Sequence, residues 1–149
     1  MKATLSHPSW YDIEKGCAQI VHQMLKDRFD PTTIVGLIRG GLVPTAIIGY
    51  MLGLDKDHII LIPFSSAQGK GEQTNNGVVL PELPTKIIWI LDDIIDSGYS
   101  MLEISNHYKQ LGYIVKTGAV YYKESACIVP DYYWKKIPKD ANFIEFPWE

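Results

Sequence analysis

The 149-residue chain has little cysteine, no excess of basic residues and no apolar stretch long enough to span a membrane. Its two cysteines, Cys17 and Cys127, lie too far apart for a metal-binding motif, so we expect reduced structural thiols in a cytoplasmic protein. The formal net charge of −3 argues against a nucleic-acid surface held by basic charge. We expect no stable membrane insertion, and the first ten residues lack the apolar core of a secretion signal.

The two standard nucleotide-binding fingerprints are also missing. No stretch reads G-x-x-x-x-G-K-[ST], and no predicted strand leads into G-x-G-x-x-G. The apolar content of 46% is normal for a globular protein, and we find no internal repeat. At this length we expect a single domain that spans residues 1–149.

The stretch from Ile87 to Ser100 carries the strongest chemical signal. It begins as an apolar run, typical of a strand that is covered on both faces, and continues into Asp92-Asp93 and then Asp96-Ser97-Gly98-Tyr99-Ser100. We predict that Ser100 opens a helix, because residues 100–103 read as a capping box. The free N–H groups of a helix N-terminus, two serine hydroxyls and a glycine together suit a phosphate monoester.

The three acids in this stretch need a different partner, because they would repel a phosphate. They suit sugar hydroxyls, a Mg²⁺ ion or a proton that must be removed. The alternative is an ordinary strand, turn and helix with solvated acids. Three acids in five positions weaken a buried strand end, so we favour the ligand-binding interpretation.

A second glycine-containing turn follows the predicted strand 33–38. Arg39-Gly40-Gly41 would offer bare backbone N–H groups and one guanidinium to an anion, directly before an apolar helix that ends at Leu52. Taken alone, a tight turn with a surface arginine explains this segment equally well.

The remaining pattern alternates helices and strands. We predict a helix capped by Ser9, a strand over residues 58–63, a long polar segment over 64–84, a helix from Ser100 to Leu111, a strand over 114–122 that ends beside Lys123, and an aromatic tail over 132–149. This alternation indicates an α/β fold with a parallel sheet and helices on both faces. Ligands of such sheets bind at the carboxyl ends of the strands, where both anion loops, the acids and Lys123 would gather.

These segments are familiar as a set. Ile90 to Ser100 resembles the phosphoribosyl-pyrophosphate motif of the type I phosphoribosyltransferases, and Arg39 to Pro44 resembles their pyrophosphate loop. Residues 137–149 are similar to the base-binding end of the bacterial xanthine–guanine (6-oxopurine) members. The resemblance implies the phosphoribosyltransferase-type fold, with a flexible flap at about 64–84 and a small C-terminal hood at about 130–149. It also implies Mg²⁺ as cofactor and a homo-oligomer.

The resemblance further implies a role for each site residue. Asp96 would be catalytic, as the base that takes a proton from the purine. The implied contacts to the donor are Asp92 and Asp93 for the ribose hydroxyls and the metal, Asp96, Ser97, Gly98, Tyr99 and Ser100 for the 5′-phosphate, and Arg39, Gly40 and Gly41 for the pyrophosphate. The implied contacts to the purine are Lys123, Phe143, Ile144 and Glu145.

The implied activity is purine salvage. The enzyme would transfer the phosphoribosyl group from phosphoribosyl pyrophosphate to guanine, xanthine or hypoxanthine. One alternative is a regulator of the same fold that senses phosphoribosyl pyrophosphate without catalysis, and another is a transferase for a different base, such as a pyrimidine. The combination of Asp96, Lys123 and Phe143 favours the purine enzyme, because a sensor needs no purine pocket.

Overall fold

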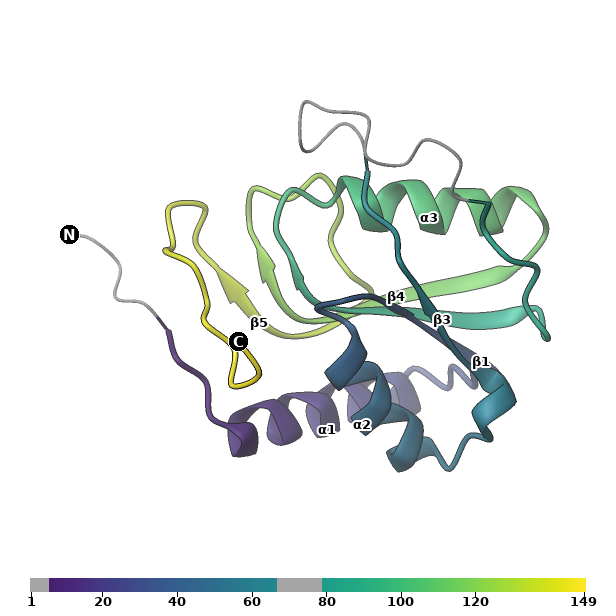
Figure 1. Cartoon of the computed structure of the whole chain (residues 1–149), viewed down its shortest axis with the longest axis horizontal. Coiled ribbons are helices and arrows are strands. Elements are labelled where there is room, and N and C mark those ends of the chain that lie inside the picture. The colour runs from purple at the N-terminus through teal and green to yellow at the C-terminus, as the bar shows by residue number, and fades with distance from the viewer. Residues whose placement is uncertain (1–5, 67–78) are drawn as a thin grey trace.

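A single five-stranded parallel sheet forms the centre of the molecule (Figure 1). The computed structural model describes residues 6–66 and 79–149. The strand order is β2-β1-β3-β4-β5, and every neighbouring pair is parallel. The elements in chain order are α1 (Trp10–Lys26), β1 (Thr33–Leu37), α2 (Leu42–Leu52), the short 3₁₀ helix η1 (Lys56–His58), β2 (Ile59–Ile62), β3 (Ile87–Ile95), α3 (Tyr99–Gln110), β4 (Ile114–Lys123) and β5 (Tyr132–Ile137). The predicted α/β class with a parallel sheet is confirmed.

Helices cover both faces of the sheet. Figure 1 shows α3 on one face and α1 with α2 on the other. Alternation along β3 supplies both layers: Ile88 and Ile90 pack in the cluster that contains α3, and Trp89 packs in the cluster that contains α1 and α2. All three side chains are 0% exposed, as expected for a strand buried on both faces.

The start of α1 follows from its local sequence. The Ser9 hydroxyl accepts from the Asp12 N–H at 3.1 Å, and the Asp12 carboxylate accepts from the Ser9 N–H at 2.8 Å. This reciprocal capping box satisfies two N–H groups that a helix start leaves unpaired, and it confirms the predicted cap. The helix then buries Ile13, Cys17 and Ile20 against the sheet.

The start of α3 differs from the prediction, because Ser100 is not its cap. Gly98 occupies the N-cap position with a φ of +88°, and the helix begins at Tyr99. Glycine adopts this left-handed conformation without steric cost, so the chain turns into the helix before Ser100 is reached. The hydroxyl of Ser100 instead accepts from the Ser66 N–H at 2.8 Å, which joins the start of α3 to the segment after β2.

The predicted aromatic tail contains a strand that the sequence analysis did not identify. β5 (Tyr132–Ile137) pairs with β4 although only residues 124–131 connect these two parallel strands. Beyond β5, within the predicted hood at 130–149, Ile144 forms an isolated parallel bridge with Ser6. The middle of the predicted flap, residues 67–78, lies outside the described residues.

Candidate active site

Three adjacent strands bring the predicted donor and purine residues to one edge of the sheet. β1, β3 and β4 lie side by side, and their carboxyl ends lead into Arg39-Gly40-Gly41, into Asp96 to Ser100 and to Lys123. Asp92 and Asp93 belong to β3 itself, which continues through Ile95 instead of ending before the acids. The sheet therefore collects the two loops that are predicted to bind anions, together with the acids, at the edge where parallel sheets bind ligands.

The turn after β1 packs directly against Asp93. A methyl group on Gly40 would overlap both carboxylate oxygens of Asp93, and one on Gly41 would lie 2.8 Å from the Leu91 carbonyl oxygen. Glycine at both positions thus allows the turn to approach β3 closely. The peptide bond between Ile38 and Arg39 is cis. Arg39 itself is exposed, and within residues 6–66 and 79–149 no acid pairs with its guanidinium.

Asp93 is buried and its neighbour Asp92 is half-buried. Asp93 is 7% exposed and accepts from the Ile94 N–H at 2.6 Å, and Asp92 accepts from the Asp93 N–H at 2.8 Å. Burial and then the neighbouring charge of Asp93 raise the pKa of Asp92 well above its ordinary value. Burial also raises the pKa of Asp93. A divalent cation beside these two carboxyl groups would stabilise their ionised forms, which are unfavourable here without it.

A pocket of about 140 Å³ lies where β3 turns into α3. Its lining comes from the end of the strand, the loop after it and the first turn of the helix: Asp92, Ile94, Ile95, Asp96, Ser97, Gly98, Ser100 and Met101. The N–H groups at the start of α3 belong to this loop, because the first helical bond runs from the Leu102 N–H to the Gly98 carbonyl at 2.9 Å. A phosphate in this pocket would meet unpaired N–H groups, the helix dipole and two serine hydroxyls.

A second pocket of about 140 Å³ shares the wall of Asp96 and Ile94 with the first. It is lined by Asp93, Ile94, Asp96, Lys123, Asn142, Phe143, Ile144, Phe146 and Glu149. The Nζ of Lys123 lies 2.8 Å from Oδ1 of Asp96, so an ammonium and a carboxylate stand together at the boundary between the two pockets. Phe143 is 85% exposed, which leaves one face of an aromatic ring open to a planar ligand.

The purine-binding residues implied by the resemblance do not all line this second pocket. Lys123, Phe143 and Ile144 do, whereas the Glu145 carboxylate lies 3.2 Å from Nδ1 of His7. The Glu145 N–H donates to the Ser6 carbonyl at 3.2 Å. Glu145 therefore joins the C-terminal segment to the residues before α1.

Sequence reasoning assigned no site role to four residues that line the second pocket, Ile94, Asn142, Phe146 and Glu149. The aromatic density of the tail was a signal for Phe146, whose ring stacks on Trp148 with centroids 4.7 Å apart. Nothing local marks Asn142 or Glu149, because their position depends on how the irregular segment after β5 folds back.

A wider hollow of about 690 Å³ adjoins the Arg39 turn. Arg39, Gly40, Leu42, Val43, Trp148 and Glu149 line it. Gly40 lines this hollow and also packs against Asp93, which lines the second pocket. The second pocket shares Ile94 and Asp96 with the first pocket and Glu149 with this hollow, so the three lie next to one another.

No group of three or more histidine, cysteine, aspartate or glutamate side chains is placed to hold a metal ion in the described part of the chain. Mg²⁺ commonly uses one or two protein carboxylates and takes its other oxygens from phosphates and water. Asp92 and Asp93 fit that limited role, because they are adjacent carboxylates whose ionisation a cation would favour.

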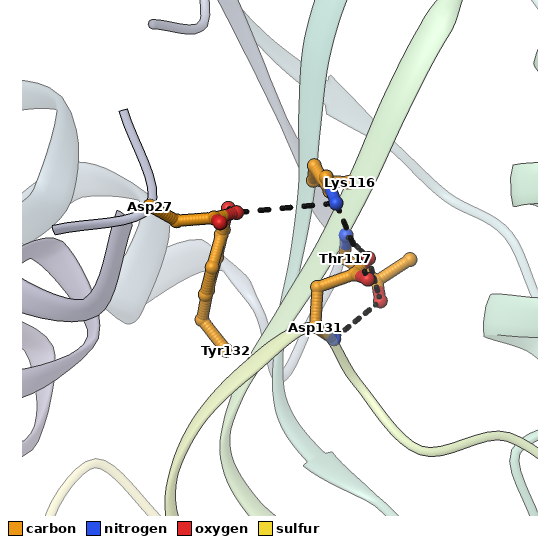
Figure 2. A network of polar contacts seen from close by, with 5 residues as sticks. All are labelled: Asp27, Lys116, Thr117, Asp131 and Tyr132. Carbon is orange, nitrogen blue, oxygen red and sulfur yellow. Dashed lines mark hydrogen bonds and ion pairs between the residues drawn. The ribbon is translucent and has the colours of Figure 1, made fainter. Parts of the chain in front are cut away.

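A further hollow, of about 490 Å³, lies at the opposite, amino edge of the sheet. Here the Lys116 ammonium is 3.9 Å from a carboxylate oxygen of Asp27 and 3.9 Å from one of Asp131 (Figure 2). The hydroxyl of Tyr132 donates to Asp27, and burial raises the pKa of Tyr132. These groups satisfy one another and join α1 to β4 and β5, so we regard this network as structural.

Comparison with known proteins decides the family. Residues 8–149 match the phosphoribosyl transferase domain. The chain belongs to the phosphoribosyltransferase family. This phosphoribosyltransferase is 30% identical over 142 residues to the xanthine-guanine phosphoribosyltransferase of Vibrio atlanticus, a match that covers 95% of this chain and 86% of that protein. It is 24% identical over 143 residues to the enzyme of the same name from Chromohalobacter salexigens, with 95% and 82% covered.

Solved structures agree on the fold of the phosphoribosyltransferase. The xanthine-guanine-hypoxanthine phosphoribosyltransferase of Helicobacter pylori superposes with a TM-score of 0.78 at 21% identity, covering 98% of this chain and 94% of that one. A purine phosphoribosyltransferase from Pyrococcus horikoshii gives a TM-score of 0.72 at 24% identity, with 97% and 93% covered. No helix among the described residues is both long and apolar enough to cross a bilayer.

Proposed function

We propose that this protein transfers the phosphoribosyl group of phosphoribosyl pyrophosphate to a 6-oxopurine, giving a nucleoside 5′-monophosphate and pyrophosphate in cytoplasmic purine salvage. The observation that carries the proposal is the shared wall between the two small pockets. Asp96 and Ile94 line both the pocket at the start of α3 and the pocket that holds Lys123 and Phe143. A donor in the first pocket and a base in the second would meet beside Asp96.

The base would enter the second pocket with its ring on the open face of Phe143. Lys123 would donate to the exocyclic oxygen of the purine, since an ammonium offers donors and no acceptor. Lys123 now pairs with Asp96, so an arriving base would separate or share this pair and leave the Asp96 carboxylate facing the imidazole ring. Both bacterial relatives are xanthine-guanine phosphoribosyltransferases, which supports the choice of a 6-oxopurine.

The donor would lie across the first pocket and the Arg39 turn. Its 5′-phosphate would take the N–H groups and hydroxyls of residues 96–100, and its pyrophosphate would take the Arg39 guanidinium and the N–H groups of the glycine turn. Asp92 and Asp93 would serve the ribose hydroxyls and hold Mg²⁺. When bound, Mg²⁺ would stabilise the negative charge of the departing pyrophosphate.

The transfer step forms one bond and breaks one. A purine ring nitrogen bonds to the anomeric carbon, the bond from that carbon to pyrophosphate breaks, and its electron pair leaves with the pyrophosphate. The proton on the other imidazole nitrogen passes to the carboxylate of Asp96. A general base in this position accounts for about 10²–10⁴-fold in rate.

A pyrophosphate-release assay tests the proposal. Purified protein with Mg²⁺ and phosphoribosyl pyrophosphate should release pyrophosphate only after guanine, xanthine or hypoxanthine is added, and competition among the three would rank them. Release with a pyrimidine alone would favour the transferase for another base. Donor binding without release for any base would favour the sensor.

We also propose that the protein functions as a homo-oligomer. Helix α2 contains no charged residue, yet Tyr50 is 89%, Leu42 is 44% and Met51 is 41% exposed. A helix that is apolar on all sides is normally covered on all sides. Because α2 begins directly after the Arg39 turn, a second copy on this face would lie close to the donor end of the site.

A further inference from the structure

The connection between β4 and β5, residues 124–131, packs against the loop over residues 96–100, which is the proposed 5′-phosphate loop. It begins after Lys123 at the end of β4, and its backbone reaches the loop at Cys127, whose N–H donates to the Ser97 carbonyl at 2.8 Å. A hydrogen bond to the Ser97 carbonyl fixes the orientation of the peptide that enters Gly98. The connection thus contacts the loop through Cys127, which lines neither small pocket.

Side chains of the same connection fill the space beside Gly98. A methyl group on Gly98 would lie 2.9 Å from Cγ2 of Ile128 and 3.1 Å from Sγ of Cys127. Gly98 is buried although the residues on either side of it, Ser97 and Tyr99, are exposed. Gly98, with its φ of +88°, is thus in contact with two side chains that line neither small pocket.

We propose that Ile128 and the Cys127 N–H are positioning groups for the 5′-phosphate loop: they hold Ser97 and Gly98 in the conformation in which the first N–H groups of α3 point into the donor pocket. This inference rests on the proposed function, because it assumes that the pocket at the start of α3 takes the 5′-phosphate. It assigns a role in donor binding to the β4–β5 connection, residues 124–131, which follows directly after Lys123.

The contact depends on the β-branch of Ile128, which gives a matched pair of substitutions. Ile128→Val keeps the Cγ2 methyl group beside Gly98, whereas Ile128→Ala removes it. Val129→Ala, at the neighbouring residue that is 62% exposed, is the control for general effects on this connection. Each purified variant would first be compared with the wild type by thermal unfolding.

The decisive measurement is the affinity for phosphoribosyl pyrophosphate with Mg²⁺, determined by calorimetry and as a KM. For Ile128→Ala we expect a donor Kd and KM raised about fivefold, with kcat and the purine KM within about twofold, because misplaced contacts weaken binding of the group they hold. Ile128→Val should recover most of the donor affinity. A purely structural role would lower the unfolding temperature without this split between the donor and purine KM values.

A second readout uses the unmodified protein. The amide of Cys127 should exchange with solvent more slowly once ribose 5-phosphate is bound, because a phosphate in the loop would stabilise the Ser97 peptide to which this amide donates. Unchanged donor affinity in Ile128→Ala, or unchanged exchange at Cys127 with ligand bound, would overturn the inference while turnover left the proposed function intact. Weakened donor binding in Ile128→Ala without purine turnover in the wild type would overturn the transfer activity and leave the positioning role standing.

Discussion

The Nζ atom of Lys123 lies 2.8 Å from Oδ1 of Asp96, and this contact joins the end of β4 to the loop after β3. The Lys123 side chain is 20% exposed and that of Asp96 is 61% exposed, so the pair is open to ligand from the carboxylate side. In the proposed reaction both partners turn to the purine, one to its exocyclic oxygen and one to its ring proton. Base binding would therefore exchange an internal ion pair for two contacts to the substrate.

The first prediction concerns Asp96. Asp96→Asn keeps the size of the side chain but removes the proton acceptor, so we expect kcat to fall by about 10²–10⁴-fold. The Kd of phosphoribosyl pyrophosphate should change little, because the loop N–H groups that hold the phosphate remain. Steady-state kinetics and calorimetry on the same preparation would measure both. Turnover equal to that of the wild type would remove Asp96 from the role of base.

The second prediction concerns Lys123. Lys123→Ala should raise the purine KM by about tenfold or more, since a hydrogen bond to a charged group contributes about 1.5–3 kcal/mol. Donor affinity should stay within about twofold. Lys136→Ala, an exposed lysine on β5, serves as the control for loss of a positive charge near the site. An unchanged purine KM in Lys123→Ala would contradict the proposed orientation of the base.

Much of the fold and of the candidate site could be predicted from the sequence, because the signals are local. The capping box at Ser9 and Asp12 involves residues three apart, and the glycine turns that follow β1 and β3 lie next to the strands they end. Parallel strands place their carboxyl ends together, so the strand pattern alone predicts that the Arg39 turn, Asp96 and Lys123 lie at one edge of the sheet.

The errors and omissions arise where distant residues decide the structure. β5 went unrecognised because its start is fixed from 14 residues away: the Asp131 carboxylate accepts from the Thr117 N–H at 2.8 Å. The predicted start of α3 at Ser100 was one residue late, because the local sequence offers both a capping box at Ser100 and a left-handed Gly98. The contacts of Gly98 with the β4–β5 connection favour Gly98 as the N-cap. The contact of Glu145 with His7 also joins residues that are remote in sequence, and the role of Glu145 in purine binding stays a prediction.

The third prediction is that Asp92→Asn stabilises the protein near neutral pH. Burial raises the folded-state pKa of Asp92 well above the ordinary 3.8, so the folded protein favours the neutral carboxyl group. The stability that Asp92 contributes is therefore full below about pH 3.8 and is lost as the pH rises through the folded-state pKa. Without Mg²⁺, the unfolding temperature of the variant should exceed that of the wild type at pH 7, by roughly 2–4 °C for each kcal/mol removed. The difference should shrink toward pH 4.

Activity gives the opposite sign for the same substitution. Asp92→Asn should lower turnover, because the ribose hydroxyls and Mg²⁺ would lose one of their two carboxylates. Thermal unfolding over a pH series with a chelator present, followed by kinetics with Mg²⁺, measures both effects. A variant that is less stable than the wild type at pH 7 would show that Asp92 is not held against its charge.

The fourth prediction concerns the network at the amino edge (Figure 2). Asp131→Ala would leave the N–H of Thr117, a residue only 2% exposed, without its acceptor, so we expect a loss of about 1–3 kcal/mol of unfolding free energy. Because β5 leads into the segment that we propose binds the base, the purine KM should rise more than the donor KM. Denaturant unfolding is the measurement, with the exposed Asp140→Ala as control. Equal stability of both variants would contradict a structural role for this network.

The fifth prediction tests the proposed association through α2. Tyr50, 89% exposed on a helix without charged residues, would lie in the interface, where a buried carboxylate without a partner is strongly unfavourable. Tyr50→Glu should therefore shift the mass measured by sedimentation equilibrium from that of the oligomer toward that of the monomer. Tyr11→Glu makes the same change at a residue 71% exposed on α1 and should leave the mass unaltered. A wild-type protein that is monomeric over the whole concentration range, or a Tyr50→Glu variant of wild-type mass, would show that this face is not the contact between copies.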